Sequence, residues 1–194
     1  MLTQVDSLRS NLAKNAIITL REMCKQLSPL LQNDLEIIVL KLLKRAADTN
    51  LFIAEESRKA LDEVCQTFDE GKIVEVLLGF NSTKTSSVKI SICNCLKTLV
   101  SNSEENFKRI RNYGQLVAMV LGYILDSSQE VRYAARIAIA ATAKHSLEID
   151  EIENILHSMG LSNASIDTVW TTINKDLSNP NTIPALSSMI TKCI

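Results

Sequence analysis

Histidine and cysteine are the side chains that most often serve as metal ligands or nucleophiles, and this chain offers few of them in useful spacings. His145 and His157 are the only histidines, and neither has a spacing typical of a metal site or a catalytic triad. His145 falls near the end of a predicted helix, where we expect it to interact with the helix dipole or to lie at the surface. Cys93 and Cys95 lie about 200° apart around a helix axis, which prevents them from holding one metal ion together and favours burial as small apolar residues.

The remaining reactive side chains do not indicate catalysis either. The acidic pairs Glu55-Glu56 and Asp62-Glu63 suit a solvated helix face better than acid-base chemistry. The sequence contains neither a glycine-rich phosphate loop nor a nucleophile elbow. We therefore expect a protein that is not an enzyme and needs no cofactor and no metal ion. An odd number of cysteines at irregular spacing predicts reduced thiols in a cytosolic protein, namely Cys24, Cys65, Cys93, Cys95 and Cys193.

The overall charge and hydropathy exclude two classes of partner. Lysine and arginine total 21 against 22 aspartate and glutamate residues, a net charge of −1, whereas binding to nucleic acid needs a dominant basic field. No run of about 18 apolar residues occurs, and the first residues lack the apolar core of a signal peptide. We therefore expect no nucleic-acid partner, no membrane partner and a location in the cytoplasm.

A repeated apolar frame predicts the fold. Its clearest copy is DSSQEVRYAARIAI, from Asp126 to Ile139, and three weaker copies precede it. Apolar or small residues recur at offsets of four, eight and eleven residues, which at about 100° per residue lie on one narrow face of a helix. The copies begin at residues 12, 53, 88 and 131, so the intervals are 41, 35 and 43 residues, the loose period of a helical-hairpin array. The frame comprises Leu12, Ala16, Leu20 and Met23; Ile53, Ser57, Leu61 and Val64; Val88, Ile92, Leu96 and Leu99; and Val131, Ala135, Ile139 and Thr142.

The predicted fold is all-α, an α-α superhelix of the HEAT or armadillo type. Leu20, Leu61, Leu96 and Ile139 should be buried on equivalent faces between two helix layers. Residues 1–147 are assigned to the repeats and residues 148–194 to a C-terminal helical cap, which Trp170 is expected to anchor onto the last repeat. Helices are predicted over residues 12–27, 35–47 (capped by Asp34), 52–68, 72–80, 88–100, 113–125, 131–144, 149–159, 165–175 and 185–193, with a linker at 101–105.

The first of these helices has no predicted partner, because the first helix of its hairpin is absent from the pattern. Leu8, Ile17 and Ile18 would then have no preceding helix to cover them. We expect the helix to fray, or to be covered by another chain or by further repeats in a longer product.

The turns inside the hairpins are the strongest candidates for a binding site. In a helical-hairpin array these turns line up along one edge. We call this the turn edge; it comprises residues 9–11, 49–52, 82–89 and 127–132. A cation at the start of a helix opposes the helix dipole, which favours a role in binding an acidic surface over the alternative of ordinary solvated charges. The cations are Arg9, Lys14, Lys84, Lys89 and Arg132, and the separate cluster Lys108, Arg109 and Arg111 is a weaker candidate for partner contact.

Three segments resemble a known family. RSNLAKNAIITLREM (Arg9 to Met23), AADTNLFIAEESRKALDEV (Ala46 to Val64) and DSSQEVRYAARIAI are similar to TOG domains of the crescerin proteins, the TOG array regulators of axonemal microtubules, and more distantly of the CLASP proteins. The similarity covers about residues 9–144. It implies six HEAT-like repeats, tubulin binding through the intra-repeat turns, and regulation of microtubules in the cytoskeleton, in cilia for crescerins.

The resemblance also implies which residues contact tubulin. Residues that match the contact-bearing turns are Thr49 and Asn50, Lys84 and Lys89, and Gln129 and Arg132, with Arg9 and Lys14 in an earlier turn. The chain departs from the pattern because the early repeats, including a turn that offers an aromatic residue to tubulin in many members, have no counterpart. It is therefore either a short member or part of a longer array. The main alternative is a HEAT-repeat scaffold that holds a peptide or helix of another protein.

Overall fold

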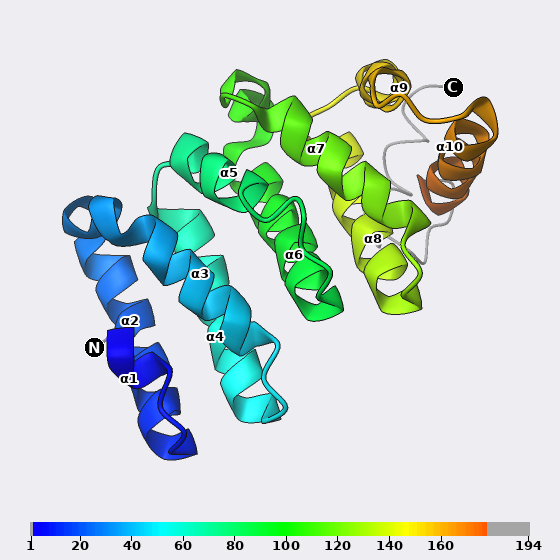
Figure 1. Cartoon of the computed structure of the whole chain (residues 1–194). Coiled ribbons are helices and arrows are strands. Elements are labelled where there is room, and N and C mark those ends of the chain that lie inside the picture. Colours follow the sequence, from blue (N-terminus) through cyan, green and yellow to red (C-terminus); the bar gives the residue numbers. More distant parts are fainter. Residues whose placement is uncertain (1, 178–194) are drawn as a thin grey trace.

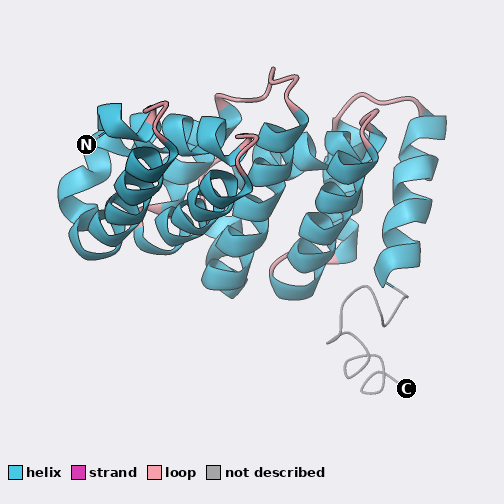
Figure 2. Ribbon diagram, turned by 90° about the horizontal axis from the view of Figure 1, so that it is seen from below, coloured by secondary structure: helices cyan, strands magenta, loops and turns pink. Residues whose placement is uncertain are grey.

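The computed structural model describes residues 2–177, and over that range it consists of helices and connecting turns, with no strand (Figure 2). Within these residues, no helix is both long and apolar enough to cross a lipid bilayer. The α-helices are α1 Leu2–Val5, α2 Ser10–Leu31, α3 Leu35–Ala46, α4 Leu51–Thr67, α5 Glu70–Leu78, α6 Ser86–Ser103, α7 Tyr113–Gly122, α8 Gln129–His145, α9 Ile149–Ser158 and α10 Asn163–Leu177, and the 3-10 helices are η1 Gln32–Asp34, η2 Glu104–Arg109 and η3 Tyr123–Leu125.

The helices form two layers (Figure 1). In one layer α2, α4, α6, α8 and α10 pack side by side, and in the other α1, α3, α5, α7 and α9 do so. The helices of a hairpin also contact each other across the layers, as α3 does with α4 and α7 with α8. The predicted all-α superhelix is confirmed, and the layering extends through α9 and α10. Whether the segment from residue 148 acts as a cap stays a prediction, and the helix expected at 185–193 lies outside the described residues.

The core between the layers follows the repeated frame in three of its four copies. All frame residues of α4, α6 and α8 are buried, and so is Leu20 of α2. The predicted burial of Leu20, Leu61, Leu96 and Ile139 is therefore confirmed. Cys24, Cys65, Cys93 and Cys95 are buried free thiols, as expected for small apolar residues, and Cys193 lies outside the described range. Trp170 packs against this core, as predicted.

The frame is wrong at the two ends of its first copy. Leu12 is 41% exposed and Met23 is only half-buried. Met23 lines a hollow beside Leu2 of α1 and Ile38 of α3, because the single turn of α1 is too short to cover it. Ile17, predicted to be uncovered, is fully buried. Arg21 lies one turn after Ile17, on the same side of α2, and donates to Glu56 of α4 at 3.2 Å. The side of α2 that carries Ile17 therefore faces α4.

The first hairpin, for which the sequence pattern predicts no first helix, does have one, the short helix α1. The single turn of α1 contacts α2 and α3, and Val5 is fully buried. Lys41 of α3 forms an ion pair with Asp6, and Arg45 donates to the carbonyl of Ser7 at 3.0 Å. α2 therefore has a partner, although Leu8 is fully exposed and Ile18 remains half-exposed.

Three local predictions need correction. Asp34 makes no side-chain cap to α3, because the 3-10 turn η1 leads directly into the helix. The predicted helix at 72–80 begins earlier, since the Asp69 carboxylate accepts the backbone N–H of Lys72 at 2.9 Å and caps α5. The predicted linker at 101–105 is instead helical, because α6 continues to Ser103 and η2 follows without a gap.

The buried frame predicts the effect of truncating one of its members. We expect Leu61→Ala, which removes a side chain only 3% exposed, to lower the free energy of unfolding by about 2 to 5 kcal/mol. Denaturant unfolding followed by circular dichroism measures this. Leu30→Ala, at a leucine that is 78% exposed, is the control and should change stability by less than about 0.5 kcal/mol. Equal effects for the two variants would contradict the assigned core.

Candidate partner-binding edge

The four turns of the turn edge follow one another along one side of the array (Figure 1), and side-chain contacts join neighbouring turns. Lys14, at the start of α2, places its ammonium 5.6 Å from the centroid of the Phe52 ring at the start of α4. Lys89, at the start of α6, pairs with Asp126 in the turn before α8 at 2.5 Å. The structure therefore brings the predicted turns together in two neighbouring pairs.

Two of the turns are built on the same backbone device. The Asp48 carboxylate accepts the N–H of Asn50 at 2.8 Å, and the Asn50 side chain caps α4 by accepting the N–H of Phe52 at 3.1 Å. The Asp126 carboxylate likewise accepts the N–H of Ser128 at 2.8 Å, and Ser128 caps α8. Asn50, predicted to contact a partner, therefore shapes the turn. Sequence reasoning missed the two aspartates, although each stands two residues before a cap.

Each of these aspartates is neutralised by a neighbouring cation. Arg45 donates to Asp48 at 2.7 Å and, through its other terminal nitrogen, to the carbonyl of Ser7, which fastens the first turn to the second. Lys89 joins the last two turns in a similar way, because its ammonium pairs with Asp126. The Lys89 side chain is only 17% exposed, since it lies over the Tyr123 ring with its ammonium 5.4 Å from the ring centroid. The Lys89 ammonium, together with the Ser128 amide, lowers the pKa of Asp126 below its ordinary value.

Arg132 is also engaged within the molecule. Its Nη1 atom donates to the carbonyls of Asp126 at 2.7 Å and Ser127 at 2.8 Å, and the side chain is half-buried. Arg132 and Lys89 therefore converge on one turn and hold it in place. Their role as direct partner contacts stays a prediction, and their internal role is the one that the geometry supports.

The other predicted residues are available to a partner. Over residues 2–177, Arg9, Lys14 and Lys84 make no salt bridge, and Arg9 and Lys84 are exposed. Thr49 and Gln129 are exposed as well. The turn edge also carries apolar side chains that sequence reasoning did not single out, since Leu51 is 75% and Phe52 is 70% exposed. The edge thus combines the exposed cations Arg9 and Lys84 with apolar surface, while the Lys14 ammonium lies over the Phe52 ring.

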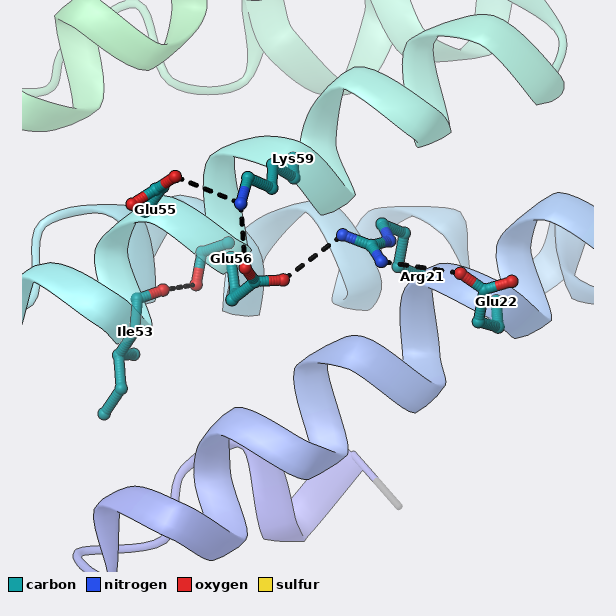
Figure 3. A network of polar contacts seen from close by, with 7 residues as sticks. Arg21, Glu22, Ile53, Glu55, Glu56 and Lys59 are labelled. Carbon is teal, nitrogen blue, oxygen red and sulfur yellow. Dashed lines mark hydrogen bonds and ion pairs between the residues drawn. The ribbon is translucent and has the colours of Figure 1, made fainter.

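The acidic pairs predicted to be solvated instead help to hold helices together. Glu56 accepts from Arg21 of α2 and pairs with Lys59, and its neighbour Glu55 pairs with Lys59 as well (Figure 3). The Lys59 ammonium is the main cause of the lowered pKa of Glu56. Asp62 accepts from Thr98 of α6 at 3.1 Å, and burial raises its pKa. These contacts link α2, α4 and α6.

The basic cluster after α6 is likewise used internally. Lys108 pairs with Glu151 of α9 at 2.6 Å, and Arg111 lies 3.6 Å from Glu75 of α5. His145 lies in the last turn of α8, where it was expected, and His157 lies 3.8 Å from Glu153. Within the described residues, no group of three or more histidine, cysteine, aspartate or glutamate side chains is placed to hold a metal ion.

The Lys89–Asp126 pair generates a prediction on stability and pH. Because folding lowers the pKa of Asp126, the pair stabilises the fold above pH 4 and loses this contribution as the pH falls through the lowered pKa. We expect Lys89→Gln to cost about 1 to 2 kcal/mol at pH 7, between a surface and a buried pair, and less at pH 3. Urea unfolding at both pH values measures the difference. Lys84→Gln is the control, and a loss that does not depend on pH would contradict the assigned pair.

Comparisons with known proteins agree with this fold. The profile of the family described as CLASP N terminal matches residues 1–148. The crescerin-like protein che-12 of Caenorhabditis elegans is 20% identical over 148 residues, which cover 74% of this chain and 12% of that protein. The chain therefore spans only a small part of the length of this relative.

Two solved structures share the arrangement of helices. The crystal structure of the MAST/Orbit N-terminal domain has a TM-score of 0.68 and 14% identity, over 89% of this chain and 75% of that one. A structure described with the words "Crescerin uses a TOG domain array to regulate microtubules in the primary cilium" has a TM-score of 0.71 and 19% identity, over 90% and 71% of the two chains. The layered hairpins are thus those of a TOG domain, and because the family profile covers well over half of the sequence, the chain belongs to the CLASP N-terminal family.

Proposed function

We propose that this chain is a tubulin-binding module that regulates microtubules, and that the turn edge is its binding surface. The family and the TOG fold support a binding module in place of an enzyme. The crescerin of known structure is described as regulating microtubules with a TOG domain array. The observation that carries the proposal is that the turns lie in a row on one edge of the array and carry exposed cations and exposed apolar side chains, namely Arg9, Lys84, Leu51 and Phe52.

The geometry suits an acidic partner surface. Arg9, Lys14 and Lys84 come from three different turns and make no salt bridge within residues 2–177. Arg9 and Lys84 are exposed, and exposed cations without an ion-pair partner strengthen the encounter with an oppositely charged surface. The layers below the turns keep these charges in a fixed order, so the edge can match an equally rigid protein surface.

The relatives support a wider setting for the module. Because the chain covers 12% of che-12, it can act beside further TOG repeats in one array. The crescerin structure is described in terms of the primary cilium. We therefore propose a location on cytoskeletal microtubules, including those of the ciliary axoneme.

A scaffold that binds a peptide or helix is the second candidate, and one feature favours it. A groove of about 970 Å³ runs between α6 and α8, with Ile90, Tyr133 and Ile137 among its lining residues. The groove also contains Lys97 and Glu130, so its charge is mixed. The mixed charge of the groove does not indicate one class of partner, whereas the cations of the turn edge indicate an acidic one. We therefore favour tubulin binding.

Charge reversal on the turn edge tests the proposal. We expect the triple variant Arg9→Glu, Lys14→Glu and Lys84→Glu to abolish co-elution with purified tubulin in gel filtration. Stability should change little, because Arg9 and Lys14 lie at the N-terminal end of α2, where a negative charge is favoured by the helix dipole. Circular dichroism and the melting temperature verify this.

A matched control changes the net charge by the same amount elsewhere. Lys25→Glu, Lys72→Glu and Lys175→Glu alter exposed cations that lie outside the turn edge and outside the basic cluster after α6, and this variant should bind tubulin like the unmodified protein. Absence of tubulin binding by the unmodified protein would overturn the proposed function. Binding that survives reversal on the turn edge would place the interface elsewhere, and the groove between α6 and α8 would be examined next through Tyr133→Ala.

A further inference from the structure

We propose that the groove between α6 and α8 is a second binding site, which takes an amphipathic helix of about three turns from a partner protein. The partner helix lies antiparallel to α6 and α8. Its first turn carries an acidic side chain beside Lys97, its apolar face fills the groove, and its last turn carries a cation beside Glu130. The site is separate from the turn edge and does not rest on the proposed binding of tubulin.

The groove lies on the outer face of the layer that contains α2, α4, α6 and α8. Its α6 residues follow the frame residue Val88 by two, six and nine positions, and its α8 residues follow Val131 by two, three and six positions. Most of these positions therefore point away from the buried frame. The residues are Ile90, Asn94 and Lys97 of α6, and Tyr133, Ala134 and Ile137 of α8. The same positions in α2 and α4 can be compared with them directly.

The outer face between α2 and α4 is closed by ion pairs of the chain itself (Figure 3). Arg21 of α2, nine positions after the first frame residue, donates to Glu56 of α4 at 3.2 Å. Lys59 pairs with the same carboxylate at 2.9 Å. The next two helices, α4 and α6, are joined on this face by the hydrogen bond from Thr98 to Asp62 at 3.1 Å. Polar side chains thus bridge both of these pairs of helices.

The pair α6 and α8 lacks the acidic group that closes the first pair. Lys97 stands at the position of Arg21, whereas Ala134 stands at the position of Glu56. Lys97 is exposed and makes no salt bridge within residues 2–177, and it acts on Asp62 of α4 only at longer range. A carboxylate from a partner can therefore take the place beside Lys97 that Glu56 takes beside Arg21.

The middle of the groove is apolar and accessible. Tyr133 stands where α4 has Glu55 and is 62% exposed, and Ile90 and Ile137 beside it are half-buried. The Asn94 side chain makes no hydrogen bond to any described residue, so it offers a donor and an acceptor to a ligand. The groove volume of about 970 Å³ has room for several apolar side chains.

The two charged side chains of the groove lie at its opposite ends and define the length and direction of the ligand. Glu130 lies one position before the frame of α8 and Lys97 nine positions after the start of the frame of α6, an axial separation of about 15 Å, or about ten helical residues. Glu130 is exposed and, in the described part of the chain, forms no salt bridge. Because acids are favoured in the first turn of a helix and cations in the last, the ligand helix begins beside Lys97 and ends beside Glu130.

The rest of this chain does not supply such a helix. Residues 178–194 contain no aspartate or glutamate, so they lack the acid that would pair with Lys97. We therefore assign the groove to a helix of a separate partner protein.

Two synthetic peptides of equal composition test the direction of binding. The peptide SEELAQLLAQLKK, acetylated, amidated and labelled with fluorescein, has the proposed pattern, and SKKLAQLLAQLEE exchanges its end charges. We expect the first peptide to bind the 194-residue protein about tenfold more tightly than the second, as measured by fluorescence anisotropy. In Lys97→Glu the first peptide should bind about tenfold more weakly and the second more tightly than before. Lys25→Glu, at an exposed cation of α2 outside the groove, is the matched control and should leave both affinities within about twofold.

A substitution that copies the closed pair tests the site itself. Ala134→Glu gives α8 the carboxylate that α4 has at Glu56, so Lys97 should pair within the chain and the first peptide should bind about tenfold more weakly. Ala134→Gln has the same size without the charge and should weaken binding by less than about threefold. Circular dichroism should show that both variants keep the helical fold. Because Ala134 lies outside the turn edge, Ala134→Glu should not change the co-elution of tubulin.

Several results would overturn the inference. One is the absence of saturable binding of the first peptide, and another is equal affinity for the two peptides. Full affinity of Ala134→Glu for the first peptide would also contradict it, since the groove would then not be the site. A dimer of the unmodified protein in gel filtration that Ala134→Glu dissociates would assign the groove to a second copy of the chain. None of these results bears on tubulin binding by the turn edge, whereas loss of tubulin co-elution in Ala134→Glu would show that the two sites are one.

Discussion

The structure depends on one constraint, that every helix of the array must bury one face between the layers while its flanks touch neighbouring repeats. Small residues at this face, such as Ser57 and Ala135, let the helices approach closely. The polar ones are satisfied within their own helix, as Ser57 donates to the carbonyl of Ile53 at 2.7 Å and Thr142 to that of Ala138 at 2.9 Å. The repeat can therefore close tightly without leaving these buried hydroxyls unpaired.

The turn edge is a consequence of this packing. Because the layers fix where each hairpin begins its second helix, turns that are far apart in the sequence lie in order on one side. Ion pairs and hydrogen bonds then join neighbours, through Arg45 at one end and Lys89 at the other. The cations of the edge thus divide into those that maintain its shape and those that remain free to bind.

The sequence predicted the layers better than the roles of individual side chains. The frame predicted buried residues correctly in α4, α6 and α8, because helical periodicity alone decides which face is apolar. It was wrong at Leu12 and Met23 of α2, because the preceding helix α1 is a single turn and leaves Met23 in a hollow beside Leu2 and Ile38. The internal role of Lys89 could not be predicted, because Asp126 is 37 residues away and meets it only after neighbouring repeats have packed. The exposure of Leu51 and Phe52 could have been predicted, because both residues precede Ile53, the first buried frame residue of α4.

The open flank of α2 has a further consequence for cooperativity. In an array where each repeat is stabilised by its nearest neighbours, a repeat with one neighbour in its layer opens at a lower free energy than an interior one. Within residues 2–177, Arg9 and Lys14 belong to a repeat with one neighbour in its layer, whereas Phe52 belongs to the next repeat, which has neighbours on both sides. In this set of residues, local opening of α2 would withdraw Arg9 and Lys14 and leave Phe52 and Lys84 in place. A ligand that contacts both repeats would bind fully only while α2 is folded onto the array. Ligand binding to the turn edge would therefore stabilise the folded first repeat.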